Sequence, residues 1–229
     1  MSVAALIVAG GRGIRFGRDV PKQFLPVGGQ PLLLHSVEIF ERMPEFNQVW
    51  LVLPAEWVAE FERRDDLSVY SKIAGCVAGG ARRQDSVAAG LKAMPPVTEI
   101  VAIHDAVRPF AAPEAIRKAI ARARRMGAAI LAAPAVDTLK RCDREGRVIE
   151  TIPRDQLWLA QTPQVFRCGL IRRAYEKALA DGVEVTDDAA AVERLGEPVE
   201  VVQSPRPNPK ITSPEDLRFA EWLLKDARP

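Results

Sequence analysis

The sequence predicts an α/β fold with a doubly wound, mainly parallel sheet and one projecting β-arm. The sheet is predicted by short apolar runs that end in glycine, proline or polar residues and alternate with segments whose apolar residues recur at helical spacing. The arm is predicted by a single stretch, 137–153, that breaks this alternation and contains two β-prone segments around a turn signal.

The composition is that of a globular protein without an extended cationic surface. Of the 229 residues, 48% are hydrophobic and 27% charged, so we expect residues 1–229 to form a single domain with a substantial core. The formal net charge of only +2 predicts neither a nucleic acid nor a membrane surface as a partner. Any anion must therefore be bound by locally placed cations.

The cysteines and the N-terminal segment favour a cytoplasmic protein. Cys76, Cys142 and Cys168 are odd in number, lie far apart and form no CxxC motif, which predicts free thiols in a reducing compartment. The run MSVAALIVAGG lacks a basic region and is too short for a signal peptide or a membrane span. We interpret it as the first buried strand.

Strands and helices alternate through the first 133 residues. Each predicted strand is a short apolar run with a turn or polar signal at its end, and each predicted helix has apolar residues at helical spacing. The predicted strands are 3–8, 48–53, 73–77, 100–103 and 128–133, and the predicted helices are 31–40, 56–64, 86–94 and 114–126. This order is typical of a parallel sheet with crossover helices.

The arm follows, between Thr138 and Ile152. Two β-prone segments flank Asp143-Arg-Glu-Gly146, which is a hairpin turn signal. The arm has few large apolar residues for a core of its own, which favours packing against another subunit; a surface hairpin without a partner is the alternative.

The last part of the chain returns to helices and one strand. The helices are predicted at 169–179 and 187–195, the strand at 199–202 and a final helix at 214–224. Ser213 supplies a hydroxyl cap for the final helix, Pro214 its first residue, and two acids its first turn.

Four loops carry unusual residues and are predicted to converge on one site. Ligands of parallel α/β sheets bind at the carboxyl ends of the strands. Three of these loops follow predicted strands and the fourth precedes the final helix; they are 9–22, 79–86, 104–109 and 208–212.

The loop 9–22 has the composition of a phosphate-binding loop. Gly10, Gly11 and Gly13 let backbone N–H groups approach a phosphate chain closely. The cations available to a triphosphate are Arg12, Arg15, Arg18 and Lys22. The loop is neither a Walker A motif nor a clean GxGxxG motif. A purely structural glycine turn is the alternative.

The loop 79–86 offers a second close backbone approach. Gly79 and Gly80 expose backbone groups, and Ser86 is predicted to open the following helix, so a nucleobase or ribose can be bound by backbone groups and one hydroxyl. The alternative is a glycine turn with Asp85 or Ser86 as a helix cap.

The loop 104–109 places a carboxylate at a strand end. Asp105 is suited to Mg²⁺, which prefers one or two carboxylates together with phosphate oxygens and water. We interpret His104 as a structural hydrogen-bonding residue rather than a base. Arg108 orients Asp105 or contacts a phosphate, with a surface charge as the alternative.

The sequence contains no evident Ser-His-Asp set, catalytic carboxylate pair or metal-ligand cluster. Chemistry that needs only positioning, a metal ion and cations fits best. The residues therefore indicate phosphoryl or nucleotidyl transfer.

Six motifs in register resemble those of the 2-C-methyl-D-erythritol 4-phosphate cytidylyltransferase family. They span nearly the whole chain: A-G-G-x-G-x-R…P-K from Ala9, G-G-x-x-R-x-x-S-V-x-x-G-L from Gly79, H-D-A-V-R-P from His104, T-I-P-R-D-Q-L-W-L-A-Q-T-P-Q-V-F from Thr151, T-D-D-A from Thr186, and N-P-K-I-T-S-P-E-D-L from Asn208. The resemblance implies a Rossmann-like nucleotidyltransferase sheet, dimerisation through the arm, and Mg²⁺-dependent transfer of CMP from CTP to 2-C-methyl-D-erythritol 4-phosphate.

The resemblance also implies roles for residues in the four loops. Arg15 and Lys22 would stabilise charge on the α-phosphate. Asp105 would bind the metal or substrate hydroxyls, and Lys210 would position the methylerythritol phosphate. Contacts to cytosine and ribose would fall on Ala9, Gly10, Gly11, Gly79, Gly80 and Ser86.

Two residues at the ends of the arm complete the implied site. Thr138 and Arg154 would reach the substrate phosphate bound by the neighbouring subunit. Many family members carry alanine where Gly10 stands, and Ile14 stands where some carry a second arginine, which leaves Arg15 as the better candidate for the catalytic arginine.

Three other functions remain as alternatives. Ribitol 5-phosphate cytidylyltransferases share the A-G-G motif and differ in the acceptor. A nicotinamide-dependent oxidoreductase predicts an acid after the second strand, where Pro54 stands. A non-catalytic nucleotide-binding module would not need Arg154 and Lys210 together.

Overall fold

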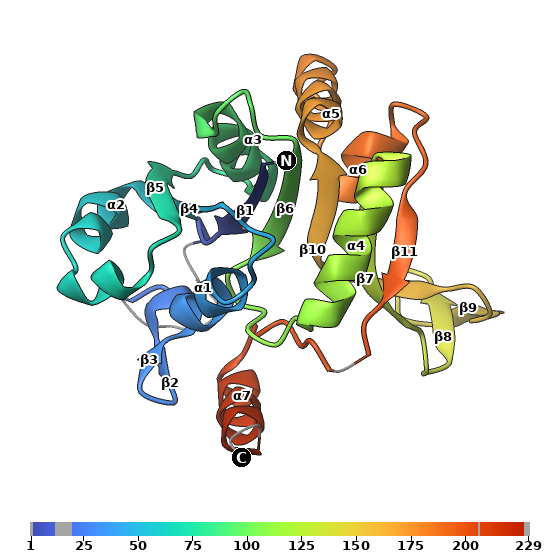
Figure 1. The fold of residues 1–229 in the computed structure, drawn as a ribbon. Helices are drawn as coiled ribbons and strands as arrows, with labels where there is room; N and C mark the ends of the chain where they lie inside the picture. The colour runs from blue at the N-terminus through green and yellow to red at the C-terminus, as the bar shows by residue number, and fades with distance from the viewer. Residues whose placement is uncertain (1, 12–19, 206, 227–229) are drawn as a thin grey trace.

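The central sheet holds seven strands in a computed structural model that describes residues 2–11, 20–205 and 207–226. In sheet order these strands are β11 (Glu200–Gln203), β7 (Ala128–Pro134), β10 (Trp158–Arg167), β6 (Ile100–Asp105), β1 (Val3–Val8), β4 (Gln48–Leu53) and β5 (Ile73–Ala78) (Figure 1). Neighbouring strands are parallel except at β10, which is antiparallel to both β6 and β7. The predicted mainly parallel sheet is confirmed.

Helices cover both faces of the sheet, as a doubly wound fold requires. Alternate residues of β1 point to opposite faces: Ile7 packs in the cluster that includes α1, α2 and α4, and Leu6 in the cluster that includes α3 and α5. Both side chains are fully buried, and each such burial contributes roughly 2 kcal/mol. The helices are α1 (Leu32–Glu41), α2 (Ala55–Glu62), α3 (Arg83–Ala93), α4 (Pro113–Met126), α5 (Cys168–Ala180), α6 (Asp188–Glu193) and α7 (Pro214–Asp226).

Smaller elements complete the described part of the chain. They are the 3₁₀ turns η2 (Lys22–Phe24) and η3 (Asp65–Val69) and the short hairpin of β2 (Pro26–Val27) and β3 (Gln30–Pro31). Within the described ranges, none of the helices combines the length and apolar character needed to span a membrane.

Strand β10 is the main difference from the sequence prediction, which has no strand at 158–167. The polar residues Gln161, Thr162 and Gln164 interrupt the apolar pattern there, and the pairing with β7 shifts register between Ala160 and Gln164. Because the irregularity hides the period of two that marks a strand, the segment was missed. It inserts between β6 and β7, in the interior of the sheet.

Helix α3 begins at Arg83, one turn before the predicted start at Ser86. Arg82 is the N-cap residue, and the carboxylate of Asp85, in the first turn of the helix, accepts the backbone N–H of Arg82 at 3.1 Å. The predicted alternative, with Asp85 or Ser86 itself as the cap, is therefore wrong in position. Ser86 therefore lies inside the helix and does not open it.

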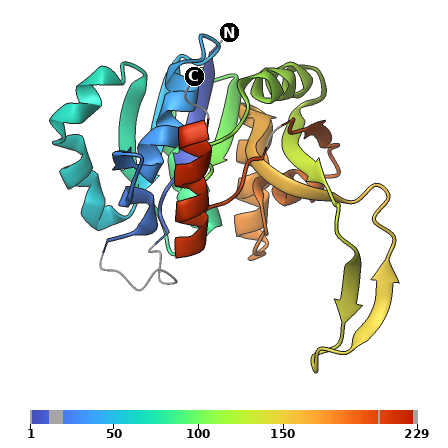
Figure 2. The ribbon, with the colours of Figure 1, turned by 90° about the horizontal axis from the view of Figure 1, so that it is seen from below.

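The arm is a two-stranded hairpin of β8 (Leu139–Cys142) and β9 (Val148–Ile152) that projects from the body of the protein (Figure 2). Its turn is the predicted one: Gly146 has a φ of 82°, which favours glycine, and the backbone N–H of Asp143 donates to the carbonyl of Arg147 at 2.9 Å. Exposed large apolar side chains gather on the arm and at its base; they are Val136, Val148, Ile149, Trp158 and Leu159.

Replacing either of two helical glycines with alanine should change the stability of the protein, in opposite directions. At Gly90 in α3, a Cβ would lie 2.5 Å from Leu6 Cδ1 and 2.9 Å from Val52 Cγ2, and both neighbours are fully buried. Overpacking costs about 1–3 kcal/mol, which outweighs the helix-propensity gain of about 1 kcal/mol. Gly169 in α5 has open space at this position. Urea unfolding should therefore show Gly90→Ala destabilised and Gly169→Ala stabilised by roughly 0.5–1 kcal/mol; shifts of the same sign would contradict this packing.

Candidate active site

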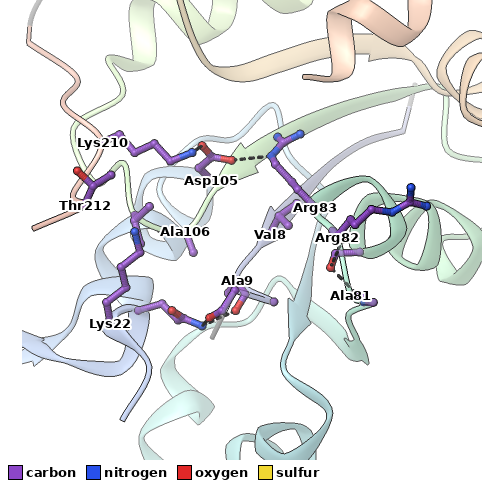
Figure 3. A pocket seen from close by; sticks show the side chains of 16 residues that line it. Val8, Ala9, Lys22, Ala81, Arg82, Arg83, Asp105, Ala106, Lys210 and Thr212 are labelled. Carbon is purple, nitrogen blue, oxygen red and sulfur yellow. Dashed lines mark hydrogen bonds and ion pairs between the residues drawn. The ribbon is translucent and has the colours of Figure 1, made fainter. Parts of the chain in front are cut away.

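A pocket of about 400 Å³ lies where the four predicted loops meet, at the carboxyl ends of β1 and β6 (Figure 3). Its size is that of a small-molecule site. Eight of the predicted site residues line it: Ala9, Gly10, Gly11, Lys22, Gly80, Ser86, Asp105 and Lys210. Four further polar residues line it that sequence reasoning did not assign to the site: Gln23, Arg82, Arg83 and Thr212.

Glycines in and beside the pocket pack against Ser86. A Cβ at Gly10 or at Gly79 would lie 2.8 Å from the Ser86 hydroxyl oxygen, so neither position has room for a side chain while Ser86 keeps its place. That hydroxyl accepts the backbone N–H of Gly80 at 3.1 Å and donates to the carbonyl of Arg82 at 3.2 Å. The serine thus holds the glycine turn in shape and also lines the pocket.

Lys22 is placed at the pocket by its neighbour Gln23. The buried Gln23 amide donates to the carbonyls of Ala9 and Gly11 at 2.5 and 2.8 Å, which ties η2 to the end of β1. The ammonium of Lys22 donates to the carbonyl of Ile211 at 2.9 Å, across to the segment before α7. The loop between these anchors contains Gly13 and Arg15, which lie outside the described residues.

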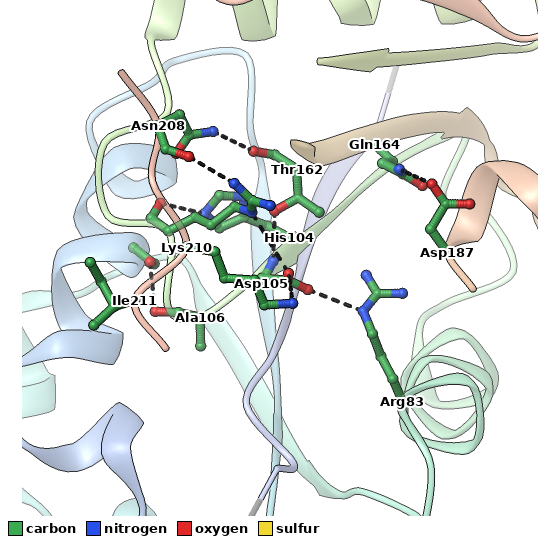
Figure 4. A network of polar contacts seen from close by, with 12 residues as sticks. Arg83, His104, Asp105, Ala106, Thr162, Gln164, Asp187, Asn208, Lys210 and Ile211 are labelled. Carbon is green, nitrogen blue, oxygen red and sulfur yellow. Dashed lines mark hydrogen bonds and ion pairs between the residues drawn. The ribbon is translucent and has the colours of Figure 1, made fainter. Parts of the chain in front are cut away.

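Asp105 lies between cations from three segments of the chain (Figures 3 and 4). Its Oδ1 accepts from Arg83 Nε at 3.1 Å, and its Oδ2 lies 2.8 Å from Lys210 Nζ and 3.8 Å from Arg108 Nε. Burial alone would raise the pKa of Asp105, but Arg83, Lys210 and Arg108 hold the pKa of this carboxyl well below its usual range. The group is therefore ionised throughout the neutral range.

His104 has the structural role predicted for it. It is fully buried, and burial lowers its pKa to about 4. A neutral ring that carries its proton on Nε2 fits both contacts: Nε2 donates to the carbonyl of Arg108 at 3.0 Å, and Nδ1 accepts from the Thr162 hydroxyl at 3.1 Å. Thr162 also accepts the backbone N–H of Asp105 at 3.0 Å, so strand β10 fixes the position of Asp105.

Arg108 is not a surface charge. Its guanidinium donates to the carbonyl of Asn208 at 2.7 Å, and the buried Asn208 amide donates to the carbonyl of Thr162 at 2.9 Å (Figure 4). These contacts join the loop after β6, strand β10 and the segment that carries Lys210. Two predicted site residues, Arg108 and Gly79, do not line the pocket, although each lies next to residues that do.

Arg83 lines the pocket, and sequence reasoning did not assign it to the site. It reaches the pocket from the first turn of α3 and donates to Asp105 and to Asp188. A signal was present, because Arg83 is the arginine of the G-G-x-x-R motif. Its partner Asp188 is distant in sequence, so the motif alone gave no reason to assign it a role.

Thr138 and Arg154 do not reach the pocket of their own chain. Both are exposed at the base of the arm, and neither lines the pocket. The Arg154 guanidinium donates to the carbonyl of Val136, which holds it against the start of the arm. A chain by itself therefore does not bring these two residues to Asp105 and Lys210.

The donors fit a Mg²⁺ ion that is bound chiefly by a phosphate ligand. Within the described ranges, no group of three or more His, Cys, Asp or Glu side chains is placed to hold a metal. Asp105 is the one carboxylate among the described residues that line the pocket. Mg²⁺ commonly takes one or two carboxylates and completes its shell with phosphate oxygens and water.

Comparison with known proteins gives consistent matches over the full length. Residues 3–226 match the family described as 2-C-methyl-D-erythritol 4-phosphate cytidylyltransferase. Proteins of that name from Syntrophus aciditrophicus and Geobacter metallireducens are 44% and 43% identical, over 97% and 100% of this chain and 96% and 100% of theirs.

Solved structures agree with the sequence matches. The crystal structure of 4-diphosphocytidyl-2C-methyl-D-erythritol synthase from Anaerococcus prevotii superposes with a TM-score of 0.86 at 36% identity, covering 98% of this chain and 96% of that one. The 2-C-methyl-D-erythritol 4-phosphate cytidylyltransferase from Thermus thermophilus gives 0.81 at 35% identity, covering 98% and 100%. These likenesses confirm the predicted Rossmann-like fold.

Proposed function

Because the chain belongs to the 2-C-methyl-D-erythritol 4-phosphate cytidylyltransferase family, we propose that the pocket around Asp105 is where it performs that family's reaction. The protein transfers CMP from CTP to 2-C-methyl-D-erythritol 4-phosphate and releases pyrophosphate, a step of isoprenoid biosynthesis by the non-mevalonate route. The observation that supports this location most directly is the set of cations, Lys22, Lys210 and Arg83, that line one pocket with the ionised carboxylate of Asp105.

The proposed mechanism is an in-line attack of the acceptor phosphate on the α-phosphorus of CTP. The attacking phosphate monoester is already anionic, so no strong general base is needed. The barrier comes largely from repulsion between two anions, which Lys22, Lys210 and Arg15 lower by placing positive charge at the reacting phosphates. The neutral His104, held by two structural hydrogen bonds, takes no part in proton transfer.

Asp105 has one of two tasks in this proposal. It would hold Mg²⁺ together with phosphate oxygens, and the ion when bound would neutralise charge on the triphosphate and the departing pyrophosphate. Alternatively, it would accept hydrogen bonds from substrate hydroxyls. Either task suits a carboxylate that stays ionised. The backbone at Ala9, Gly10, Gly11 and Gly80, with the hydroxyl of Ser86, is proposed to contact cytosine and ribose.

We propose a homodimer in which the arm of one subunit completes the site of the other. Two features support it: the exposed apolar side chains of the arm, Val148 and Ile149 among them, and the position of Thr138 and Arg154 away from their own pocket. In the dimer, Thr138 and Arg154 would bind the acceptor phosphate across the interface. A cytoplasmic location is proposed as well, supported by the free state of Cys76, Cys142 and Cys168.

An assay of pyrophosphate release with two different acceptors tests which acceptor the enzyme uses. With CTP and Mg²⁺, pyrophosphate should form rapidly with 2-C-methyl-D-erythritol 4-phosphate and much more slowly with ribitol 5-phosphate, because the relatives named above act on the former. Pyrophosphate release is followed with each acceptor at matched concentrations, and CTP alone is the control. A preference for ribitol 5-phosphate would replace the acceptor while leaving the nucleotidyl-transfer chemistry in place.

A further inference from the structure

A fully buried carboxylate stands directly behind the pocket. Asp188, the first residue of α6, has no exposed surface. Arg83 donates to it twice, from Nη1 to Oδ1 at 2.9 Å and from Nη2 to Oδ2 at 2.8 Å. The hydroxyl of Tyr175, on α5, donates to Oδ1 at 2.6 Å. Asp188 does not line the pocket, so it has no direct access to a ligand there.

The buried position of Asp188 restrains Arg83 strongly. An unpaired buried charge costs several kcal/mol, so the guanidinium cannot turn away without leaving Asp188 uncompensated. The two-point contact also fixes the plane of the guanidinium, because both donor and acceptor groups are planar. Nη1 and Nη2 each donate one N–H to Asp188, and the nitrogen that contacts Asp105 in this orientation is Nε, at 3.1 Å from Oδ1.

This restraint determines which oxygen of Asp105 each cation contacts. Its Oδ1 is bound by Arg83, whereas Oδ2 is bound by Lys210 at 2.8 Å. A guanidinium released from Asp188 is able to bind both oxygens of Asp105 in a two-point pair and displace Lys210. We propose that Asp188 is a positioning residue that, with Tyr175, holds Arg83 so that Asp105 keeps one oxygen for Lys210 and the ligand. This inference builds on the proposed function and adds a residue outside the pocket to its machinery.

The test compares Asp188→Asn with a matched control, Asp187→Asn. The neighbouring Asp187 caps α6 through the backbone N–H of Ala190 and accepts from Gln164, and it has no contact with Arg83 in the structure. Asp188→Asn is expected to lower kcat/KM about 10- to 100-fold, by analogy with the residues that orient metal ligands from outside the first coordination shell. Asp187→Asn should stay within about threefold of wild type, since asparagine also caps helices.

A double-mutant cycle separates positioning from general destabilisation. If Asp188 acts through Arg83 on Asp105, the Asp188→Asn change should cost less than about twofold in an Asp105→Asn background, because contacting residues in one network are not additive. A similar loss in both backgrounds would overturn the proposal, as would a folded Asp188→Asn enzyme with wild-type kcat/KM. Tyr175→Phe, which keeps the packing and removes one hydrogen bond, should give a smaller loss of about 3- to 10-fold; it serves if Asp188→Asn fails to fold.

A readout that does not require activity keeps the inference separate from the proposed function. In a crystal structure of Asp188→Asn, or of Tyr175→Phe if the former does not fold, the contact between Arg83 Nε and Asp105 Oδ1 should be replaced by another arrangement. Its retention at 3.1 Å in that variant would overturn the positioning role. Failure of the wild-type protein to release pyrophosphate with either acceptor would instead overturn the proposed function alone.

Discussion

Replacing Lys22 with alanine is expected to lower kcat by roughly two to three orders of magnitude without unfolding the protein. The ammonium lies in the pocket and is held by the carbonyl of Ile211, on the same segment as Lys210. A preorganised cation at a reacting phosphate contributes about 3 to 4 kcal/mol to transition-state stabilisation, and its removal therefore reduces turnover more than substrate binding. The measurement is steady-state pyrophosphate release at saturating CTP and acceptor.

The matched control for Lys22→Ala is Lys118→Ala. Lys118 is exposed on α4 and does not line the pocket, so this change removes the same charge and side chain from a remote surface. Its turnover should equal that of wild type. Arg15→Ala is expected to match Lys22→Ala on the basis of the family motif. Near-normal turnover of a folded Lys22→Ala enzyme would remove Lys22 from the mechanism.

Two inactive variants should regain activity when they are unfolded and refolded together. In the proposed dimer, Lys22 and Arg154 serve one site from two chains, so each single-variant homodimer has both sites damaged. A mixed dimer of Lys22→Ala and Arg154→Ala chains concentrates both changes in one site and leaves the other intact. Random pairing gives half mixed dimers with one good site each, and therefore about a quarter of wild-type activity.

This complementation experiment has a direct control and a clear contrary outcome. Each variant refolded alone should stay inactive, and a pull-down with differently tagged chains should establish that mixed dimers form. If mixed dimers form and activity does not rise above that of the parents, Arg154 acts within its own subunit or not at all. The shared site would then be wrong, while the roles proposed for Lys22 and Asp105 would stand.

Much of the fold was predictable because its elements are locally marked. Strand β1 is an uninterrupted apolar run, β4 is apolar after Gln48, β6 is apolar up to His104, and the arm carries its own turn signal at 143–146. Strand β10 was not predictable by the same reasoning, because its middle is polar. Those polar side chains bond inward: Thr162 to His104, and Gln164 to the start of α6. These long-range hydrogen bonds stabilise the strand although its sequence lacks the apolar alternation of a strand, and a single sequence does not reveal such contacts.

The residues of the candidate site also fall into a group that the sequence predicted and a group that it did not. Residues on glycine-rich and basic loops were found because parallel strands bring their carboxyl ends together, a rule that needs no knowledge of side-chain contacts. The residues that hold those loops were missed. Gln23, Arg83 and Asn208 each act through a partner more than ten residues away in the sequence, such as Ala9 for Gln23. Arg83 and Asn208 belong to the quoted motifs, but a motif does not show which partner a side chain contacts, and Gln23 carries no such signal.

The position of β10 has a consequence for how the chain is made. Strands β6 and β7 follow one another along the chain, yet in the sheet β10 lies between them and pairs with both. On the ribosome, a nascent chain that has not yet extended past Arg167 lacks the strand that joins the two halves of the sheet. The backbone N–H of Asp105 likewise has its acceptor, the hydroxyl of Thr162, only after β10 has been made. The segment before β10 carries Gly10, Gly11, Gly80 and Lys22 of the pocket, but its sheet and its carboxylate Asp105 gain these contacts only after residues 158–167 have been synthesised.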